Sequence, residues 1–445
     1  MRSTLFLSVC TATVLAQNSI LDHSHVGICR SPLLSSLDFL FEKRICSPYG
    51  GALDNRRDEG HSTSTGPWSH SRCYRNGTDE FCMYTSTTFA ENRGISILTT
   101  PERVAKFSKL RAFTDPKSIK DVNQDIVRTL PARYNVVPIP GKDMGVTAKQ
   151  PLNRGDLIMS NTASMMIDYA AFETLPHADL QKIQAAGVDA LPTAHRARFL
   201  NLSTHNPTEG YYQRVEKLLA TNAFDIDVDD GGETEFFVVF PEIARFNHDC
   251  RPNADYWFDP ETLTQYIHAV RPIAAGEEIT ISYMDPVNTR KNRMHKLHHV
   301  WGFKCSCSQC TKPRLISRDS DDRVRQIQAL RADLQDHSGG SRATPQMAEL
   351  FVSLFEQERL ESMAYEAHTH AALEWNGVGE PWLATKHARL AIEHGLASVG
   401  PRNSDVVEMQ ALAEDPWSHW SWMSRTKRRM GWGRREESDD EEEED

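Results

Sequence analysis

The sequence lacks a surplus of positive charge. Its formal net charge is −11 at pH 7, and residues 436–445 contain nine carboxylates and no cation. Subtracting those nine charges leaves −2 for residues 1–435, so the body of the chain does not indicate a large nucleic-acid-binding face. The segment just before these acids mixes arginines with tryptophans, and we interpret residues 416–445 as a solvated, disordered tail.

A membrane-spanning pattern is also missing. Residues 5–16 carry no charge, but this run is too short to cross a bilayer as a stable anchor. Arg2 precedes it, and small residues at 14–16 offer cleavage before Gln17. This layout is typical of a secretory signal peptide over residues 1–16.

Cysteine is scarce, with nine among 445 residues. Removal of the signal peptide would take Cys10 and leave eight. Four of them, in the first hundred residues, predict two disulfides in an oxidising compartment, with three pairings open: Cys29, Cys46, Cys73 and Cys82. The alternative is four reduced cysteines behind an apolar N-terminal helix, outside the secretory pathway.

The pattern along the chain predicts an α+β protein. Turn residues make residues 17–130 loop-rich, with a short strand near 95–99 and a helix that begins at Pro101. Strand patterns with glycine turns dominate residues 134–159 and 235–283, and helical periodicity fills residues 168–223. An acidic, glycine-bearing loop is expected at 225–232. Residues 290–300 read as a helix with Arg293, Leu297 and Trp301 on one face, and residues 319–413 as a plain helical bundle.

Three thiols lie within six positions at Cys305, Cys307 and Cys310. A tetrahedral zinc site needs four ligands, and Cys250 is the candidate for the fourth. Four thiolates leave no position for a water, so this zinc would be structural.

The stretches RFNHDCRPN at 245–253 and GEEITISY at 276–283, followed by CSCSQC at 305–310, resemble the SET-domain protein methyltransferases. Within them, the chain is most similar to the SET-and-MYND group and to fungal SET proteins without a MYND finger. The resemblance covers about residues 133–312. It implies a SET-type β-rich fold of short sheets with a helical insertion at about 168–235, a zinc-bound post-SET tail and an α-helical C-terminal array.

The resemblance also implies roles for individual residues. Tyr283 matches the tyrosine beside the methyl-transfer channel, and the four cysteines match the post-SET zinc site. The residues that would bind S-adenosyl-L-methionine are Lys142, Met144, Asn247, His248, Trp301 and Phe303. An asparagine suits this role because its amide can donate to the carboxylate of the cofactor and accept from its ammonium.

The chain departs from the family at two points. The cofactor loop usually has glycine at its centre, whereas this chain has Asp143, which tolerates the left-handed backbone region better than most residues. The insertion at 168–235 has no cysteine, so a MYND finger is absent. The implied domains are a signal peptide (1–16), a cysteine-containing region (17–130), the SET domain (131–285), the post-SET segment (286–315), a helical domain (319–415) and the tail (416–445).

The function implied by the resemblance is a protein-lysine N-methyltransferase that acts as a monomer on a protein substrate. The rival hypothesis is a catalytically inactive SET scaffold, possible for a secreted chain because S-adenosylmethionine is made in the cytosol. The family otherwise indicates the nucleus or cytoplasm. The sequence leaves the substrate protein open.

Overall fold

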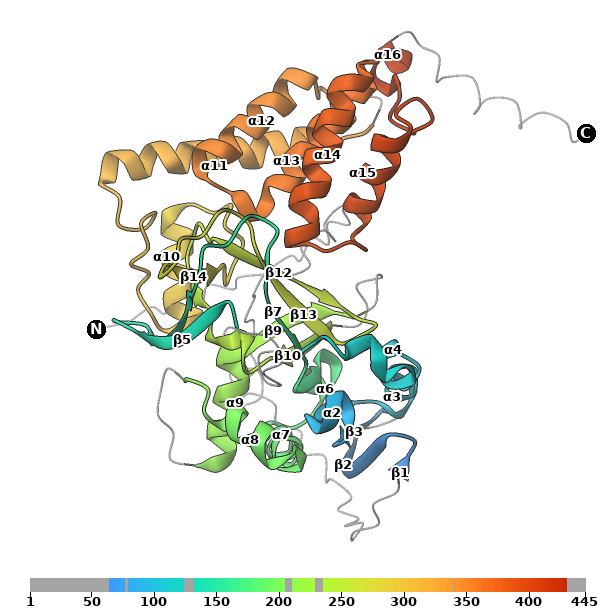
Figure 1. Ribbon diagram of the computed structural model, residues 1–445, viewed down its shortest axis with the longest axis vertical. Coiled ribbons are helices and arrows are strands. Elements are labelled where there is room, and N and C mark those ends of the chain that lie inside the picture. Colours follow the sequence, from blue (N-terminus) through green and yellow to red (C-terminus); the bar gives the residue numbers. More distant parts are fainter. Residues whose placement is uncertain are drawn as a thin grey trace, which may run out of the picture.

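The structure is a computed structural model that describes residues 64–76, 79–123, 132–204, 210–228, 235–338 and 340–429. The signal-peptide prediction, Cys29 and Cys46 lie outside these residues. The described chain forms three sheets, a group of helices beneath them and a helical array above (Figure 1). No helix among the described residues combines the length and apolarity needed to cross a membrane.

The largest sheet has seven strands and is covered on both faces. Its order is β1 (Ser64–Thr65), β2 (Trp68–Asn76), β3 (Asp79–Ser86), β4 (Ile95–Thr99), β8 (Met165–Asp168), β10 (Glu235–Val239) and β9 (Ala223–Asp227). Side chains alternate between faces along a strand, so Phe236 and Val238 join one core cluster while Phe237 and Val239 join another. Residues 64–99 are therefore mainly strands, and the loop-rich prediction does not hold for this part of the chain.

Two smaller sheets carry the sequence motifs. One has the order β11 (Asn247–His248), β14 (Glu278–Ile281), β6 (Asp143–Ala148) and β5 (Tyr134–Ile139). The other has the order β12 (Ala254–Asp259), β13 (Thr264–Ala269) and β7 (Leu157–Thr162). The pairing of β11 with β14 is parallel, which places Asn247 beside Thr280 and His248 beside Ile281.

Short helices flank the N-terminal strands. They are α2 (Phe89–Asn92), α3 (Pro101–Phe107), α4 (Arg111–Thr114) and the 3-10 turn η2 (Pro116–Ile119). Helix α3 begins at the proline as expected, and the Thr100 side chain accepts a hydrogen bond from the Arg103 backbone N–H at its N-terminus. Cys73 and Cys82 lie opposite each other on β2 and β3 and form a disulfide.

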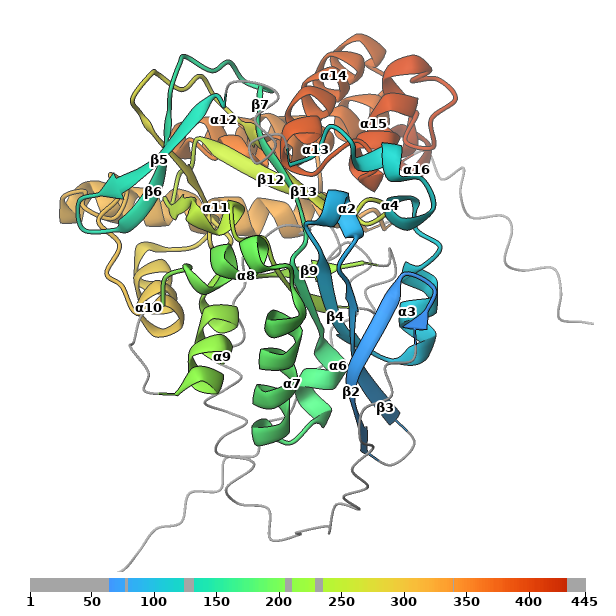
Figure 2. The same ribbon diagram turned by 60° about the horizontal axis from the view of Figure 1, so that its bottom comes forward.

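The helical insertion packs on the outer face of the large sheet (Figure 2). It consists of α6 (Tyr169–Thr174), α7 (His177–Ala190), α8 (Thr193–Leu200) and α9 (Tyr211–Asn222). The helices end earlier than the predicted limit of 235, because Ala223, Phe224 and Ile226 form β9 and pair with β10. Asp225 and Asp227 accordingly belong to a strand rather than to the predicted acidic loop.

The C-terminal array begins after the cysteines. Its elements are α11 (Arg314–Gln335), α12 (Pro345–Glu358), η4 (Glu361–Met363), α13 (Ala364–Gly377), α14 (Pro381–Ser398), α15 (Ser404–Glu414) and α16 (Ser424–Arg429). Helix α14 packs against β12 and β13, so the array covers the small sheet. The predicted disordered tail is wrong for residues 416–429, because Ser421 and Arg425 are buried against the array.

Candidate functional site

Asn247 joins three strands at the centre of the motif region. The turn η3 (Ile243–Arg245) leads into β11, where the Asn247 Nδ2 donates to the Met144 carbonyl at 3.2 Å and to Glu278 Oε1 at 3.0 Å. Gly145 permits this approach, since a Cβ at that position would lie 2.6 Å from Asn247 Nδ2. The asparagine side chain is therefore held against the backbone of the predicted cofactor loop.

Glu278 is a site residue that the sequence reasoning missed. Its second oxygen, Oε2, lies 2.7 Å from Lys142 Nζ, so one carboxylate binds both Lys142 and Asn247. The motif that contains Glu278 was recognised, but its strand position alone did not show that this glutamate faces the loop. The structure thus brings together three of the predicted cofactor residues, Lys142, Met144 and Asn247.

Asp143 adopts the left-handed conformation for which the family uses glycine, with φ of 65°. Its carboxylate accepts a hydrogen bond from the hydroxyl of Ser203, which lies between α8 and α9 of the helical insertion. This bond gives the carboxylate a partner outside the Asn247–Glu278 contact and anchors the loop to the segment that follows α8.

Tyr283 and His248 are linked through the backbone and through their rings. The Tyr283 N–H donates to His248 Nδ1 at 3.0 Å, and the Tyr283 hydroxyl donates to the Phe246 carbonyl at 2.8 Å. Burial lowers the pKa of His248 to about 3, so the imidazole is neutral. Because Nδ1 accepts, the proton lies on Nε2, which is 3.3 Å from the Cys250 sulfur. The His248 side chain therefore faces the thiols, and only its backbone is left for the predicted cofactor role.

Two aromatic residues at the end of α10 (Arg290–Trp301) surround Tyr283. The ring centroid of Trp301 lies 5.4 Å from that of Tyr283, and the Phe303 ring lies 6.4 Å away in an edge-on arrangement. Gly302 ends the helix in the left-handed region, at φ of 70°. Trp301 is buried in the core whereas Phe303 is partly exposed, so of the two Phe303 presents more ring surface to a ligand.

The four predicted metal ligands form one buried cluster. The sulfurs of Cys250, Cys305, Cys307 and Cys310 all lie within 4.8 Å of one another, and Cys250 and Cys310 are 3.5 Å apart. Zinc–thiolate bonds of about 2.3 Å place tetrahedral sulfurs about 3.8 Å apart. The donor type, number and spacing of this cluster therefore fit a structural zinc ion.

Arg293 lies beside the thiols and was assigned only to a helix face from the sequence. Its guanidinium is buried and donates to the Asn288 carbonyl. Burial lowers the pKa of Arg293, but the sulfurs of Cys250 and Cys310 together raise it by more, so the net shift is upward. A fixed positive charge at this place offsets part of the negative charge of four thiolates.

A separate cavity of about 200 Å³ lies between the N-terminal region and the helical insertion. His195 lines it, and burial, followed by the charge of Arg93, lowers the pKa of this histidine to about 3. The cavity contains none of the motif residues.

The SET domain family model matches residues 143–284, which include Asn247 and Tyr283 of this site. The chain is 32% identical over 195 residues to histone-lysine N-methyltransferase set5 of Schizosaccharomyces pombe, covering 44% of this chain and 56% of that protein. A SET and MYND domain-containing protein of Dictyostelium discoideum is 34% identical over 116 residues, covering 24% of this chain and 34% of that protein.

Histone-lysine N-methyltransferase SMYD3 of Mus musculus is 38% identical over 72 residues, which is 16% of each chain. These matches confirm the predicted resemblance and fold class. The matched regions span less than two thirds of each of these relatives.

Proposed function

We propose that this chain is an S-adenosyl-L-methionine-dependent protein-lysine N-methyltransferase. The observation that carries the proposal is the arrangement of Asn247, Tyr283 and the thiol cluster around one short turn. Asn247, Tyr283 and Cys250 lie within the residues that the SET domain model matches. Two relatives named histone-lysine N-methyltransferase are 32% and 38% identical to parts of this chain, which supports the proposal. The substrate class is accordingly a protein with an accessible lysine.

The residues present suit the proposed cofactor. Both Nδ2 hydrogens of Asn247 are bonded, to Met144 and Glu278, so Asn247 offers its Oδ1, which can accept from the ammonium of the cofactor. The backbone around Met144 offers further polar groups, and the partly exposed Phe303 ring offers a surface for the adenine. When bound, S-adenosylmethionine supplies an electrophilic methyl group on a sulfonium. Asp143 does not oppose this role, because its carboxylate is bonded to Ser203.

Tyr283 would orient the lysine. Its hydroxyl hydrogen is directed to the Phe246 carbonyl, so the oxygen can accept an N–H from an incoming ε-amine and align the amine lone pair. The amine must be neutral to attack. Burial beside Tyr283, Trp301 and Phe303 lowers the pKa of a lysine, which favours that form without a strong base.

The proposed zinc has a structural role. Cys250 follows the Asn247–His248 pair by two residues, and the other three cysteines follow Phe303. Zinc bound by the four sulfurs would therefore hold the Asn247 turn against the segment that carries Phe303.

The test is the Tyr283→Phe variant. We expect methyl transfer from labelled S-adenosylmethionine to proteins of a cell lysate to fall by about two orders of magnitude or more. Calorimetric cofactor affinity should stay within about threefold, because the ring and its packing remain. A matched control is Tyr84→Phe, a buried tyrosine on β3 outside the site, which should keep activity.

Two results would contradict the proposal. Equal loss of cofactor binding and methylation in Tyr283→Phe would remove the orienting role. A folded wild-type protein that does not bind the cofactor would favour the inactive scaffold instead.

A further inference from the structure

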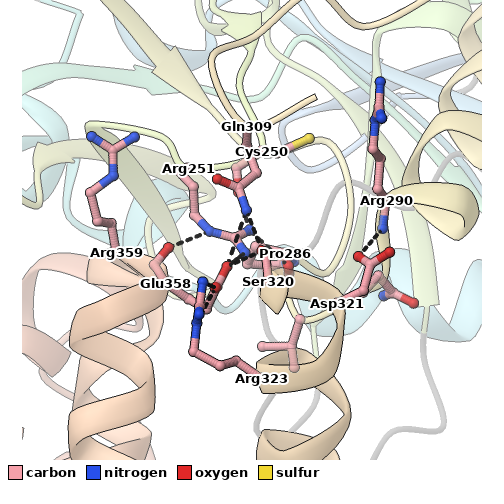
Figure 3. Close-up of polar contacts among 12 residues, drawn as sticks. Cys250, Arg251, Pro286, Arg290, Gln309, Ser320, Asp321, Arg323, Glu358 and Arg359 are labelled. Carbon is pink, nitrogen blue, oxygen red and sulfur yellow. Dashed lines mark hydrogen bonds and ion pairs between the residues drawn. The ribbon is translucent and has the colours of Figure 1, made fainter. Parts of the chain in front are cut away.

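A single buried carboxylate connects the helical array to the thiol cluster. Glu358 is the last residue of α12, and its side chain has no exposed surface. Its Oε2 accepts from Arg251 at 2.8 Å, from Gln309 at 3.1 Å and from Ser320 at 2.7 Å (Figure 3). Its Oε1 accepts from Arg323 at 2.8 Å. Four donor side chains from distant parts of the chain thus meet at one carboxylate.

Two of these partners are neighbours of the cysteines. Arg251 follows Cys250 and Gln309 precedes Cys310. The predicted zinc site is built from two chain segments, one with Cys250 and one with the other three thiols. Glu358 therefore binds both segments at positions next to their ligand residues.

Arg251 also binds the backbone of the site directly. Its side chain is 1% exposed, and its Nη1 donates to the Cys250 carbonyl at 2.7 Å and to the Pro286 carbonyl at 3.0 Å. Pro286 lies three residues after Tyr283. The Arg251 Nε donates to the Glu358 backbone carbonyl, at the negative end of α12. One planar guanidinium therefore fixes the Cys250 turn and the chain after Tyr283 against the helix end.

We propose that Glu358 and Arg251 are positioning residues for the thiol cluster and, through it, for the cofactor turn at Asn247. The helical array would then complete the site instead of being an appended module. The inference rests on the proposed function for the identity of the zinc and the cofactor. The contacts of Glu358 and Arg251 do not depend on that function.

A second buried ion pair in the array serves as a control for the Glu358–Arg251 pair. Arg425 and Glu374 form a similarly buried pair between α16 and α13, with side chains 9% and 2% exposed. This pair joins parts of the array to each other, and neither residue contacts the cysteine segments. Substitution in either pair removes a buried ionic contact. Of the two, only the Glu358–Arg251 pair lies next to the cysteines that would bind zinc.

The experiment compares Glu358→Gln with the control Glu374→Gln in the full chain, at a temperature where circular dichroism shows both to be folded. The first readout is the rate of zinc transfer to a coloured chelator. The second is the calorimetric dissociation constant for S-adenosylmethionine.

Loss of a group that orients metal ligands commonly lowers metal affinity by about 10–100-fold, so we expect at least about tenfold faster zinc transfer from Glu358→Gln. Cofactor binding should weaken with it, while Glu374→Gln stays within about twofold.

Arg251→Lys keeps the test valid if Glu358→Gln does not fold. Lysine keeps the positive charge but cannot span the carbonyls of Cys250, Pro286 and Glu358 together. We expect it to release zinc faster as well. Zinc transfer in both variants at the rate of Glu374→Gln would overturn the inference, as would a wild-type protein without zinc.

The two proposals fail in different ways. A wild-type chain that holds zinc but transfers no methyl group would refute the proposed enzyme, and faster zinc release from Glu358→Gln would still support the positioning role. Conversely, if the wild type is active and Glu358→Gln transfers zinc and binds the cofactor as the wild type does, only the positioning role is overturned.

Discussion

At the scale of single residues, Asp143 shows how a departure from a motif is accommodated. The loop needs a positive φ, which glycine adopts freely and most L-residues do not. Asp143 adopts φ of 65° and its carboxylate bonds to Ser203. The side chain thus forms a tertiary hydrogen bond, to a residue 60 positions away, that offsets a less favourable backbone conformation.

Substitution of Asp143 tests this account. We expect Asp143→Gly to leave calorimetric S-adenosylmethionine affinity within about threefold of wild type, because glycine fits the backbone. Asp143→Val should lower the free energy of unfolding by about 1–3 kcal/mol and weaken binding, because a β-branched residue is strained at positive φ. A tenfold loss of affinity in Asp143→Gly would instead show that the carboxylate takes part in binding.

The residues that sequence reasoning found differ in kind from those it missed. Asn247, Tyr283 and the cysteines stand in local patterns with recognisable chemistry. Glu358 stands in an ordinary amphipathic helix, 107 positions from its partner Arg251. Nothing in its local sequence distinguishes it from an exposed glutamate, since only the tertiary fold brings the partners together.

At the scale of elements, helix ends were harder to predict than helix interiors. The pattern of residues 319–413 predicts a helical bundle but does not mark its internal helix ends: α12 ends at Glu358, and Arg359 takes φ of 54°. Arginine favours helix, so propensity does not explain the break. Arg251 binds the Glu358 carbonyl and carboxylate, and these tertiary contacts stabilise the helix end at this position.

Helix α16 is the second element that the local sequence does not predict. Its Arg425 side chain enters the array beside Gly377, where a Cβ would lie 2.8 Å from Arg425 Cγ, and its Nε lies 3.1 Å from both oxygens of Glu374. A basic segment near an acidic end predicts a solvated tail. The structure instead holds this segment on the array through the Arg425–Glu374 pair and through Asn376, which donates to the Pro416 carbonyl and the Ser421 hydroxyl.

Removal of the Arg425 charge should therefore destabilise the protein strongly. Arg425→Gln leaves Glu374 buried without its partner, and we expect the free energy of unfolding to fall by about 3–5 kcal/mol in denaturant titrations. The double variant with Glu374→Gln should recover part of this loss, because no unpaired charge remains. A single variant within about 1 kcal/mol of wild type would contradict the structural role of α16.

At the scale of the whole molecule, several buried histidines make stability depend on pH. In the array, burial lowers the pKa of His370 to about 4, with smaller effects from Glu366, which raises it, and from His337 and Arg331, which lower it. Burial likewise lowers the pKa of His394 to about 4 and that of His368 to about 3. The fold therefore prefers these imidazoles neutral.

The sign of the pH effect follows from this preference. The folded pKa of His370 is below the ordinary value of 6.5, so its stabilisation is complete above pH 6.5 and is lost as pH falls toward 4. Between pH 7 and pH 5, His370 alone should reduce the free energy of unfolding by about 2 kcal/mol. His370→Gln should narrow the difference between the two pH values by that amount, and an unchanged difference would contradict the prediction.

The contact between Arg251 and Glu358 also has a consequence for biosynthesis. Their separation of 107 residues means that Arg251 leaves the ribosome on the order of 5–20 s before its partner is made. Cys305, Cys307 and Cys310 are made within that interval, so all four cysteines are present before the carboxylate that neutralises Arg251. If Glu358 positions the cluster as proposed, the cluster gains this contact only after α12 has been translated, and a chain that terminates before Glu358 would lack it.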